Sequence, residues 1–383
     1  MPRILVLTNG WTGKEMNGGE YHIMRVLRNW SNKNQISVIM PKSGYKSSTD
    51  ILLPNRYTIY FSSYEEKVGG LTSEVTFYLR RIIRSSLLKV KQNPEVVVSS
   101  SHMLYDVLPA LILSKRRKSK LVIYVHHVIR SFRSYGHGIW TSVSLLNEKM
   151  GLLLSKNADL VFVVNHDVKD TLIGKGFQAD KIFVTGNGIE QEAIDSIKMN
   201  TKEFDGCFCG RLTSIKGVYD LIDVWDGVLR YFPQSRLVII GHGPEYDKLL
   251  KVVRSKALDK NIILTGFIPE EKKFSIIKSS TIFISASYEE GWGIAVSEAM
   301  ACGLAVVCYN LSAYEVFGDA IIKVDVGNKQ KLVQAIVDLL RDENKREFLA
   351  NKAKELSKLL NWDNISAEEL EQICKLVNHK RDL

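Results

Sequence analysis

Residues 281–308, TIFISASYEEGWGIAVSEAMACGLAVVC, hold two short apolar runs separated by about one helix length of chain. The runs Thr281–Ser285 and Ala305–Cys308 are continuously hydrophobic, as is typical of parallel strands that are buried on both faces. Between them, a tryptophan flanked by two glycines leads into small helix-forming residues. The stretch therefore predicts a strand–helix–strand unit of a parallel sheet, with a helix that starts near Gly293.

The same alternation of apolar runs and helix-length segments continues on both sides of this unit. In the first half of the chain the predicted strands are Ile4–Leu7, Ile36–Met40, Val96–Ser99, Leu121–Val125, Leu160–Val164 and Ile182–Val184. In the second half they also include Gly206–Cys209, Leu237–Ile240, Ile262–Leu264 and Ile321–Val324. Two successive series of this kind predict an α/β protein with two doubly wound, Rossmann-like domains.

The length of 383 residues agrees with this division, because a domain takes up roughly 150 residues. A new strand begins at Gly206, so the boundary is expected shortly before it. We expect an N-terminal domain at 1–189, a linker at 190–203 and a second domain at 204–360. The remaining residues, 361–383, are expected to form a helical segment that packs back on the N-terminal domain.

Composition excludes several classes of protein. No apolar run approaches the ~18 residues of a membrane span, and the N-terminus lacks the apolar region of a signal peptide, so we expect a cytoplasmic protein. The five cysteines are expected to be reduced, and Cys207 and Cys209 to serve packing, since no second pair has zinc-ligand spacing. The first loop lacks a GxGxxG spacing, which argues against a dinucleotide-binding oxidoreductase.

The net charge of +10 is carried by the first half of the chain. Residues 1–200 hold 27 Lys and Arg against 16 Asp and Glu, whereas residues 201–383 hold 25 against 26. Such asymmetry indicates an anionic partner for the first half. Nucleic acid is not expected, because no RNA- or DNA-binding motif is present.

Polar motifs follow the predicted strands, and ligands of open parallel sheets collect beyond the carboxyl ends of strands. Glu290 and Glu298 flank the glycine-rich turn of the opening stretch. On residue type alone, this pair could be the acid and base of a hydrolase, a metal site or a hydroxyl-binding pair. The amides at the start of the following helix suit a phosphate or sugar oxygen. Arg211 and Lys216, five positions apart after another strand, could neutralise a diphosphate.

The motifs taken together resemble those of retaining glycosyltransferases of family 4, which have the GT-B fold of two Rossmann-like domains facing across a cleft. The matching residues are Gly18-Gly19, His126, Asn187-Gly188, Gly210-Arg211-Leu212 through Lys216-Gly217, Gly241–Glu245, and Glu290 and Glu298 with Ala299–Gly303. The chain departs from the family pattern at Trp292, at Ala305 and before Glu315, where a Gly-Gly pair is usual. The role of Glu315 therefore stays open.

The resemblance implies transfer of a sugar from a nucleotide diphosphate sugar to a hydroxyl acceptor, as in glycan or glycolipid assembly. It implies a hexosyltransferase with catalytic residues His126, Arg211, Lys216 and Glu290. It implies donor-binding residues Gly19, Arg211, Lys216, Gly243, Phe267, Ile268, Glu290, Gly291, Trp292, Gly293, Ile294 and Glu298. The alternatives are a nucleotide-sugar epimerase or phosphorylase of the same fold, and a non-catalytic subunit that binds sugar nucleotides.

Two expectations concern partners. The sequence has no DxD motif after a strand, so we expect no metal and no cofactor beyond the sugar nucleotide. The segment Glu74–Lys91 has apolar residues at helical spacing, at positions 75, 78, 79, 82, 83, 87 and 90. Arg80, Arg81, Arg84 and the cluster Lys115–Lys118 supply positive charge beside this stripe. The pattern favours either an ordinary packed helix or peripheral docking on an anionic membrane, on its cytoplasmic face, where a lipid-linked acceptor would lie.

Overall fold

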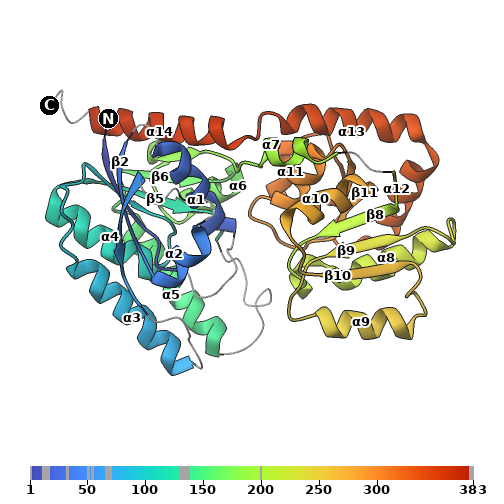
Figure 1. The fold of residues 1–383 in the computed structure, drawn as a ribbon, viewed down its shortest axis with the longest axis horizontal. Helices are drawn as coiled ribbons and strands as arrows, with labels where there is room; N and C mark the ends of the chain where they lie inside the picture. Colours follow the sequence, from blue (N-terminus) through green and yellow to red (C-terminus); the bar gives the residue numbers. More distant parts are fainter. Residues whose placement is uncertain are drawn as a thin grey trace. The chain divides into compact units, whose positions relative to one another are not determined.

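The protein forms two compact units (Figure 1) in a computed structural model, Met1–Asn187 with Trp362–Leu383, and Gly188–Asn361. The structure describes residues 2–10, 18–31, 34–49, 52, 56–64, 71–128, 139–198 and 201–378. The second unit is one continuous piece of chain, whereas the first unit is completed by the last helix.

The first unit is built on a parallel sheet. In the described ranges its strands are β1 Arg3–Leu7, β2 Gln35–Met40, β3 Tyr57–Phe61, β4 Val96–Ser99, β5 Lys120–Val125, β6 Leu160–Val163 and β7 Ile182–Val184. Their order is β3-β2-β1-β4-β5-β6-β7, and Leu5 of β1 stands opposite Ser37 of β2 and Val97 of β4. Both alternating sets of strand residues are buried, so helices cover both faces.

Helices connect these strands. They are α1 Gly18–Trp30, α2 Lys42–Ser48, α3 Leu71–Leu87, α4 Leu104–Arg117, α5 Ile139–Ser155, α6 His166–Gly174 and, at the end of the chain, α14 Trp362–Asn378. On one face, α1 and α14 pack on Val6, Val98 and Tyr124. Helix α4 packs on β4 and β5 and lies between α3 and α5 (Figure 1).

Helix α14 is fixed to α1 by hydrogen bonds as well as by apolar packing. The indole N–H of Trp30, a fully buried residue, donates to the carbonyl oxygen of Ser366 over 2.8 Å. The side-chain amide of Asn29 donates to the carbonyl oxygen of Trp362 and to the hydroxyl of Ser366. The last helix is therefore an integral part of the first core.

The second unit repeats the architecture with a smaller parallel sheet. Its strands are β8 Phe204–Cys209, β9 Leu237–Ile240, β10 Ile262–Gly266, β11 Ser280–Ser285, β12 Ala305–Tyr309 and β13 Ile322–Val324, in the order β10-β9-β8-β11-β12-β13. Its helices are α7 Gln191–Ser196, α8 Val218–Leu229, α9 Tyr246–Ser255, α10 Glu270–Lys278, α11 Ile294–Ala301, α12 Lys329–Arg341 and α13 Glu343–Ser357. Helix α7 lies inside the segment expected as a linker.

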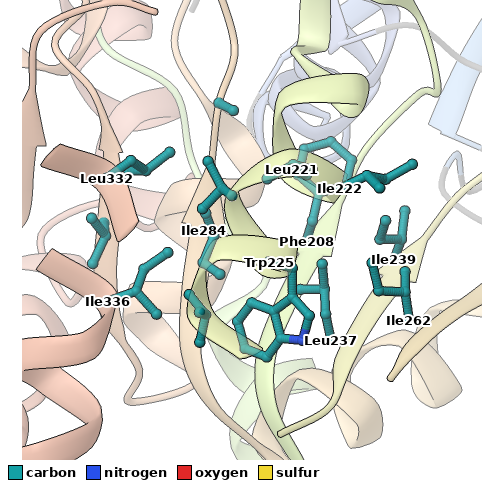
Figure 2. Packing of buried hydrophobic residues seen from close by; sticks show 14 of the residues in the cluster. Phe208, Leu221, Ile222, Trp225, Leu237, Ile239, Ile262, Ile284, Leu332 and Ile336 are labelled. Atoms are coloured by element: carbon teal, nitrogen blue, oxygen red, sulfur yellow. The ribbon is translucent and has the colours of Figure 1, made fainter. Parts of the chain in front are cut away.

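The core of the second unit forms where α8 and α12 pack on the sheet (Figure 2). Trp225 of α8 is fully buried beside Phe208 and Leu237. A Cβ atom at Gly206 would come within 2.6 Å of the Trp225 ring, so the glycine makes room for the indole. This packing fixes the ends of the loop between β8 and α8, which contains Arg211 and Lys216.

The predicted fold class is confirmed, with one strand missed. Strand β3, with the sequence YTIYF, is an edge strand whose residues are only partly buried. Its apolar pattern is therefore weaker than that of the central strands. The five cysteines are all free thiols, and Cys207 is buried in the sheet.

The predicted orientation of the basic helix is wrong in one respect. In α3 the packed side chains include Phe77, Arg81 and Ser85, whereas Leu79 and Ile83, assigned to the apolar stripe, are exposed by 52% and 58%. Arg81, which the sequence analysis placed beside the apolar stripe as a source of surface charge, is fully buried and donates to the carbonyl oxygen of Asn9 and the hydroxyl of Ser63. Burial lowers its pKa to about 10. Distant polar partners thus override the local pattern.

Candidate functional site

The motif loops of the second unit gather at the carboxyl edge of its sheet. Backbone hydrogen bonds join them directly: Leu212 N–H donates to the His242 carbonyl over 3.0 Å, and Glu245 N–H donates to the Leu212 carbonyl over 3.1 Å. The N–H of Tyr288 donates to the carbonyl of Ile215 over 2.8 Å. The loops after β8, β9 and β11 therefore form one connected surface.

Lys216 and Glu290 meet on this surface. The lysine Nζ lies 2.6 Å from Glu290 Oε2, and the hydroxyl of Ser287 donates to Glu290 Oε1 over 2.9 Å. The approach depends on Gly217, whose φ of 62° is left-handed and whose missing Cβ would lie 1.8 Å from the Ala286 carbonyl oxygen. Two residues that the sequence assigned to catalysis are thus brought together by a glycine of the same motif.

The turn that follows Glu290 has the geometry of a helix start. Gly293 has a φ of 92°, and a Cβ there would lie 2.5 Å from the Tyr314 ring. Helix α11 begins at the next residue, Ile294, as the sequence predicted to within one position. The first amides of the helix have no intrahelical acceptor, so this turn can bind an anionic oxygen.

Trp292, assigned to donor binding, has its side chain turned into the fold. It is 5% exposed, packs edge-on against Phe317 with ring centroids 5.8 Å apart, and donates its indole N–H to Ser297. Because the indole is buried and already paired, only the backbone of Trp292 is left for its predicted role in donor binding. Gly291 lies in the same turn, between Glu290 and the tryptophan.

Glu298 is buried in α11 and paired with a residue that sequence reasoning missed. Its Oε1 lies 2.8 Å from Nζ of Lys273, on α10. Burial raises the pKa of Glu298, and the ammonium group of Lys273 offsets part of that effect. Removal of either partner would leave a buried charge, which costs about 3–5 kcal/mol. Glu298 therefore supports the fold as well as facing the carboxyl edge of the sheet.

The remaining donor-side residues are more open. Arg211 is exposed in the loop after β8, and Ile268 is half-buried in the loop after β10. Phe267, directly after β10, is 75% exposed, which is unusual for an aromatic side chain. Gly243 lies directly against the backbone of Leu212. Glu315, whose role the sequence left open, is exposed in a short 3-10 turn.

Asp220 of α8 holds the loop that contains Glu290 through hydrogen bonds. No sequence motif indicated this role for Asp220. The hydroxyls of Tyr288 and Tyr309 both donate to its Oδ2, over 2.6 and 2.8 Å. Lys329 lies 3.2 Å from Oδ1. The carboxylate thereby connects two strand ends to two helices. An aspartate in a helix next to a basic loop gives no local signal of such a role.

In the first unit, two of the predicted residues lie against each other. His126 follows β5, and a Cβ at Gly19, in the first turn of α1, would come within 3.0 Å of His126 Nδ1. The Nε2 atom of His126 is buried and has no hydrogen-bond partner within the described ranges. Burial lowers the pKa of His126 well below its usual value, and the neighbouring His22 and His102 lower it further. The ring is therefore neutral at physiological pH.

Within the described residues, no group of three or more His, Cys, Asp or Glu side chains is placed to hold a metal ion. Nor does any described helix have the length and apolar character to cross a membrane.

Comparisons with known proteins cover nearly the whole chain. Residues 190–356 match the family model of glycosyl transferases group 1, and residues 16–193 match that of glycosyltransferase family 4. An uncharacterized glycosyltransferase of Methanocaldococcus jannaschii is 28% identical over 304 residues, which are 74% of this chain and 76% of that protein.

A second relative comes from Campylobacter jejuni, the N-acetylgalactosamine-N,N'-diacetylbacillosaminyl-diphospho-undecaprenol 4-alpha-N-acetylgalactosaminyltransferase. It is 28% identical over 240 residues, 60% of this chain and 64% of that one. The crystal structure of HepE from Anabaena, in complex with UDP and glucose, superimposes with a TM-score of 0.76 at 16% identity. It covers 98% of this chain and 100% of its own, so the two proteins share a fold.

Proposed function

Because this chain belongs to the group 1 glycosyltransferases of the GT-B fold, which act in glycan and glycolipid assembly, we propose that it transfers a hexose from a nucleotide diphosphate sugar to a hydroxyl acceptor, with retention of configuration. The observation that carries this proposal is the Lys216–Glu290 pair beside the start of α11. It combines a cation for a diphosphate, a carboxylate for sugar hydroxyls and free helix amides at one sheet edge.

The leaving diphosphate is assigned to Arg211, Lys216 and the amides of α11. An ammonium group has three N–H donors, so Lys216 can keep its bond to Glu290 and still offer donors to phosphate oxygens. Fixed positive groups stabilise the charge that develops as the bond from the sugar to the phosphate breaks. Glu290, held by Ser287 and Lys216, is assigned to the hydroxyls of the sugar.

The nucleoside is assigned to the neighbouring loop and helix. The exposed ring of Phe267 offers a stacking surface for the base, with Ile268 beside it. Glu298 pairs with Lys273 through Oε1, and Oε2 is assigned to a ribose hydroxyl. The backbone of Gly243, Gly291, Trp292, Gly293 and Ile294 completes the donor site of the second unit. Gly19, in the first unit, stays a donor-binding residue by prediction from the sequence alone.

In the proposed reaction, the acceptor oxygen bonds to the anomeric carbon on the face from which the diphosphate leaves. The bond from that carbon to the phosphate oxygen breaks, and the acceptor proton passes to the departing phosphate. No protein nucleophile is needed. His126, a neutral ring in the first unit, is assigned to the acceptor side. Metal is not required, because Arg211, Lys216 and the helix amides supply the positive charge.

The proposed acceptor is lipid-linked and reached from an anionic membrane surface. The name of the Campylobacter relative describes a diphospho-undecaprenol acceptor for that enzyme. In this chain, Val75, Leu79, Ile83 and Leu87 form an exposed apolar stripe along α3, which we call the α3 stripe. Arg80 and Arg84 are exposed beside it. Apolar residues with flanking bases favour docking at an anionic interface.

The function is tested by combining ligand binding with turnover. The purified protein is heated with UDP, GDP, ADP and their sugars, and a ligand at 100 times its Kd should raise the free energy of unfolding by about 2.7 kcal/mol. The best donor is then incubated with lipid-linked or glycan acceptors, with and without excess chelator. Transfer that survives chelation supports the proposal. Loss that Mg²⁺ or Mn²⁺ restores contradicts metal independence.

Other products would identify the alternatives. A changed sugar nucleotide without an acceptor indicates an epimerase, and dependence on inorganic phosphate indicates a phosphorylase. Binding without turnover on any acceptor indicates a non-catalytic subunit.

A further inference from the structure

A buried polar network connects the last helix to the histidine that follows β5. Glu369 of α14 is fully buried, and its Oε1 lies 3.0 Å from Nε2 of His22, on α1. Its Oε2 accepts a hydrogen bond from the hydroxyl of Tyr124, on β5, over 2.7 Å. The Nδ1 atom of His22 lies 3.0 Å from Asn187 Oδ1. One carboxylate thus holds two aromatic side chains on different elements.

Both of these side chains contact the ring of His126. The His126 ring stacks on Tyr124, with centroids 5.6 Å apart and planes inclined by 9°. The edge of His22 also contacts this ring, with centroids 5.1 Å apart and planes inclined by 70°, and the His22 and Tyr124 rings contact each other with centroids 5.3 Å apart. The backbone of Gly19 lies next to the Nδ1 atom of His126, where a Cβ atom would come within 3.0 Å of it. The orientation of His126 therefore depends on where Tyr124 and His22 are held.

The two oxygens of Glu369 matter to this arrangement, and not only the length of its side chain. An ionised carboxylate accepts at both oxygens, so it can bind the Tyr124 O–H and the His22 Nε2–H together. A glutamine in its place has one oxygen and presents an NH₂ group to one of these donors. Either the tyrosine hydroxyl must rotate or the hydrogen bond to His22 must rearrange. In both cases the support of His126 changes.

We propose that Glu369 is a positioning residue, which fixes His22 and Tyr124 from the last helix and through them holds the ring of His126 for the acceptor. The importance of this ring for turnover rests on the proposed function. The arrangement of the rings does not, so the two can be tested separately.

The first test reads the rings directly. Protein labelled with ¹⁵N-histidine is compared as wild type, Glu369→Gln and Tyr124→Phe, with His22 and His126 signals assigned from His→Asn variants. Glu369→Gln should shift the ring signals of both His22 and His126. Tyr124→Phe removes one donor and should shift His126, while His22 keeps its hydrogen bond to Glu369. The neighbouring Glu368 is exposed on the same helix, and Glu368→Gln should match wild type. Unchanged His126 signals in Glu369→Gln overturn the proposal.

The second test is a double-mutant cycle on turnover. Glu369→Gln should lower kcat at least ~10-fold with the KM for the donor unchanged, because the donor site lies in the second unit. In a His126→Ala background the same substitution should change kcat less than about twofold, since its effect passes through the missing ring. Equal losses in both backgrounds would mean a structural role only. If no variant turns over any sugar nucleotide, the proposed function fails, and the ring signals still decide the positioning role.

Discussion

Among single side chains, Lys216 is the one whose loss should be most costly to turnover. It lies 2.6 Å from Glu290, which precedes the start of α11 by four residues. Lys216→Ala should lower kcat/KM at least ~100-fold, because one preorganised electrostatic contact is worth about that much. Initial rates with the best donor measure the effect.

The matched control is Lys251→Ala. Lys251 is an exposed lysine on α9 of the same unit and has no assigned role. It should retain the wild-type rate, and both variants should unfold at the wild-type urea concentration. Equal rates in the two variants would remove Lys216 from the site.

A second prediction concerns Asp106, which is buried in the first unit and accepts hydrogen bonds from Asn9 N–H and Ser101. Burial raises the pKa of Asp106 to about 7. The native state therefore holds a proton that the unfolded state loses near pH 4, so the stability from this group falls as pH rises from about 4 to 7. Asp106→Asn removes that dependence. Its free energy of unfolding relative to wild type should increase by about 1.4 kcal/mol per pH unit from pH 5 to about pH 7, and then stay level to pH 8.

Urea unfolding at the two pH values measures this difference. Asp180→Asn, at an exposed position of the same unit, should show none. A relative stability of Asp106→Asn that stays flat or falls with pH would contradict the buried-proton explanation.

How much of the site the sequence could predict depended on how far apart its partners lie in the chain. Lys216 and Glu290 were named because each belongs to a local motif. Lys273 was missed because its only sign is the pair with Glu298, 25 positions away on another helix. The His22–Glu369 pair spans 347 positions, and no local pattern encodes it. Sequence spacing shows the groups that face a ligand, whereas the groups that hold them are set by packing.

Among the elements, strands and helices were predicted according to how evenly they are buried. Central strands such as β4, with every residue buried, are continuously apolar and were predicted within one or two residues. The edge strand β3 lacks that pattern and was missed. Helix α3 was placed correctly, but its inward face was not, because Arg81 is buried by hydrogen bonds to Asn9 and Ser63.

The α3 stripe leads to a prediction at the level of this helix. Leu79→Asn with Ile83→Asn should weaken sedimentation with vesicles of phosphatidylcholine and phosphatidylglycerol at least ~10-fold, because two exposed apolar side chains are lost. Arg80→Gln with Arg84→Gln should weaken it less and remove most of its dependence on salt.

The control is Phe348→Asn, since Phe348 is 67% exposed on α13 of the second unit. It should bind vesicles as wild type does. Binding that is equal on purely neutral vesicles, or indifferent to both α3 variants, would leave a soluble acceptor as the better proposal.

For the whole molecule, the division into two units predicts the effect of shortening the chain. A chain that ends at Asn361 retains all of the second unit and lacks α14. The first unit then exposes Trp30 and leaves His22 and Tyr124 without Glu369. Limited proteolysis should degrade residues 1–187 and leave a protected fragment that contains 188–361. Equal protection of both parts would contradict the assignment of α14 to the first core.

Helix α14 also dictates the order in which the protein can be completed during synthesis. The ribosome makes residues 1–187 first, but their core lacks its last helix until residue 378 has been added. At roughly 5–20 residues per second, the first unit waits on the order of ten to forty seconds while the second unit emerges whole. The part of the chain that is translated first is therefore finished last. In that interval the indole of Trp30 and the side chain of His22 lack their partners on α14.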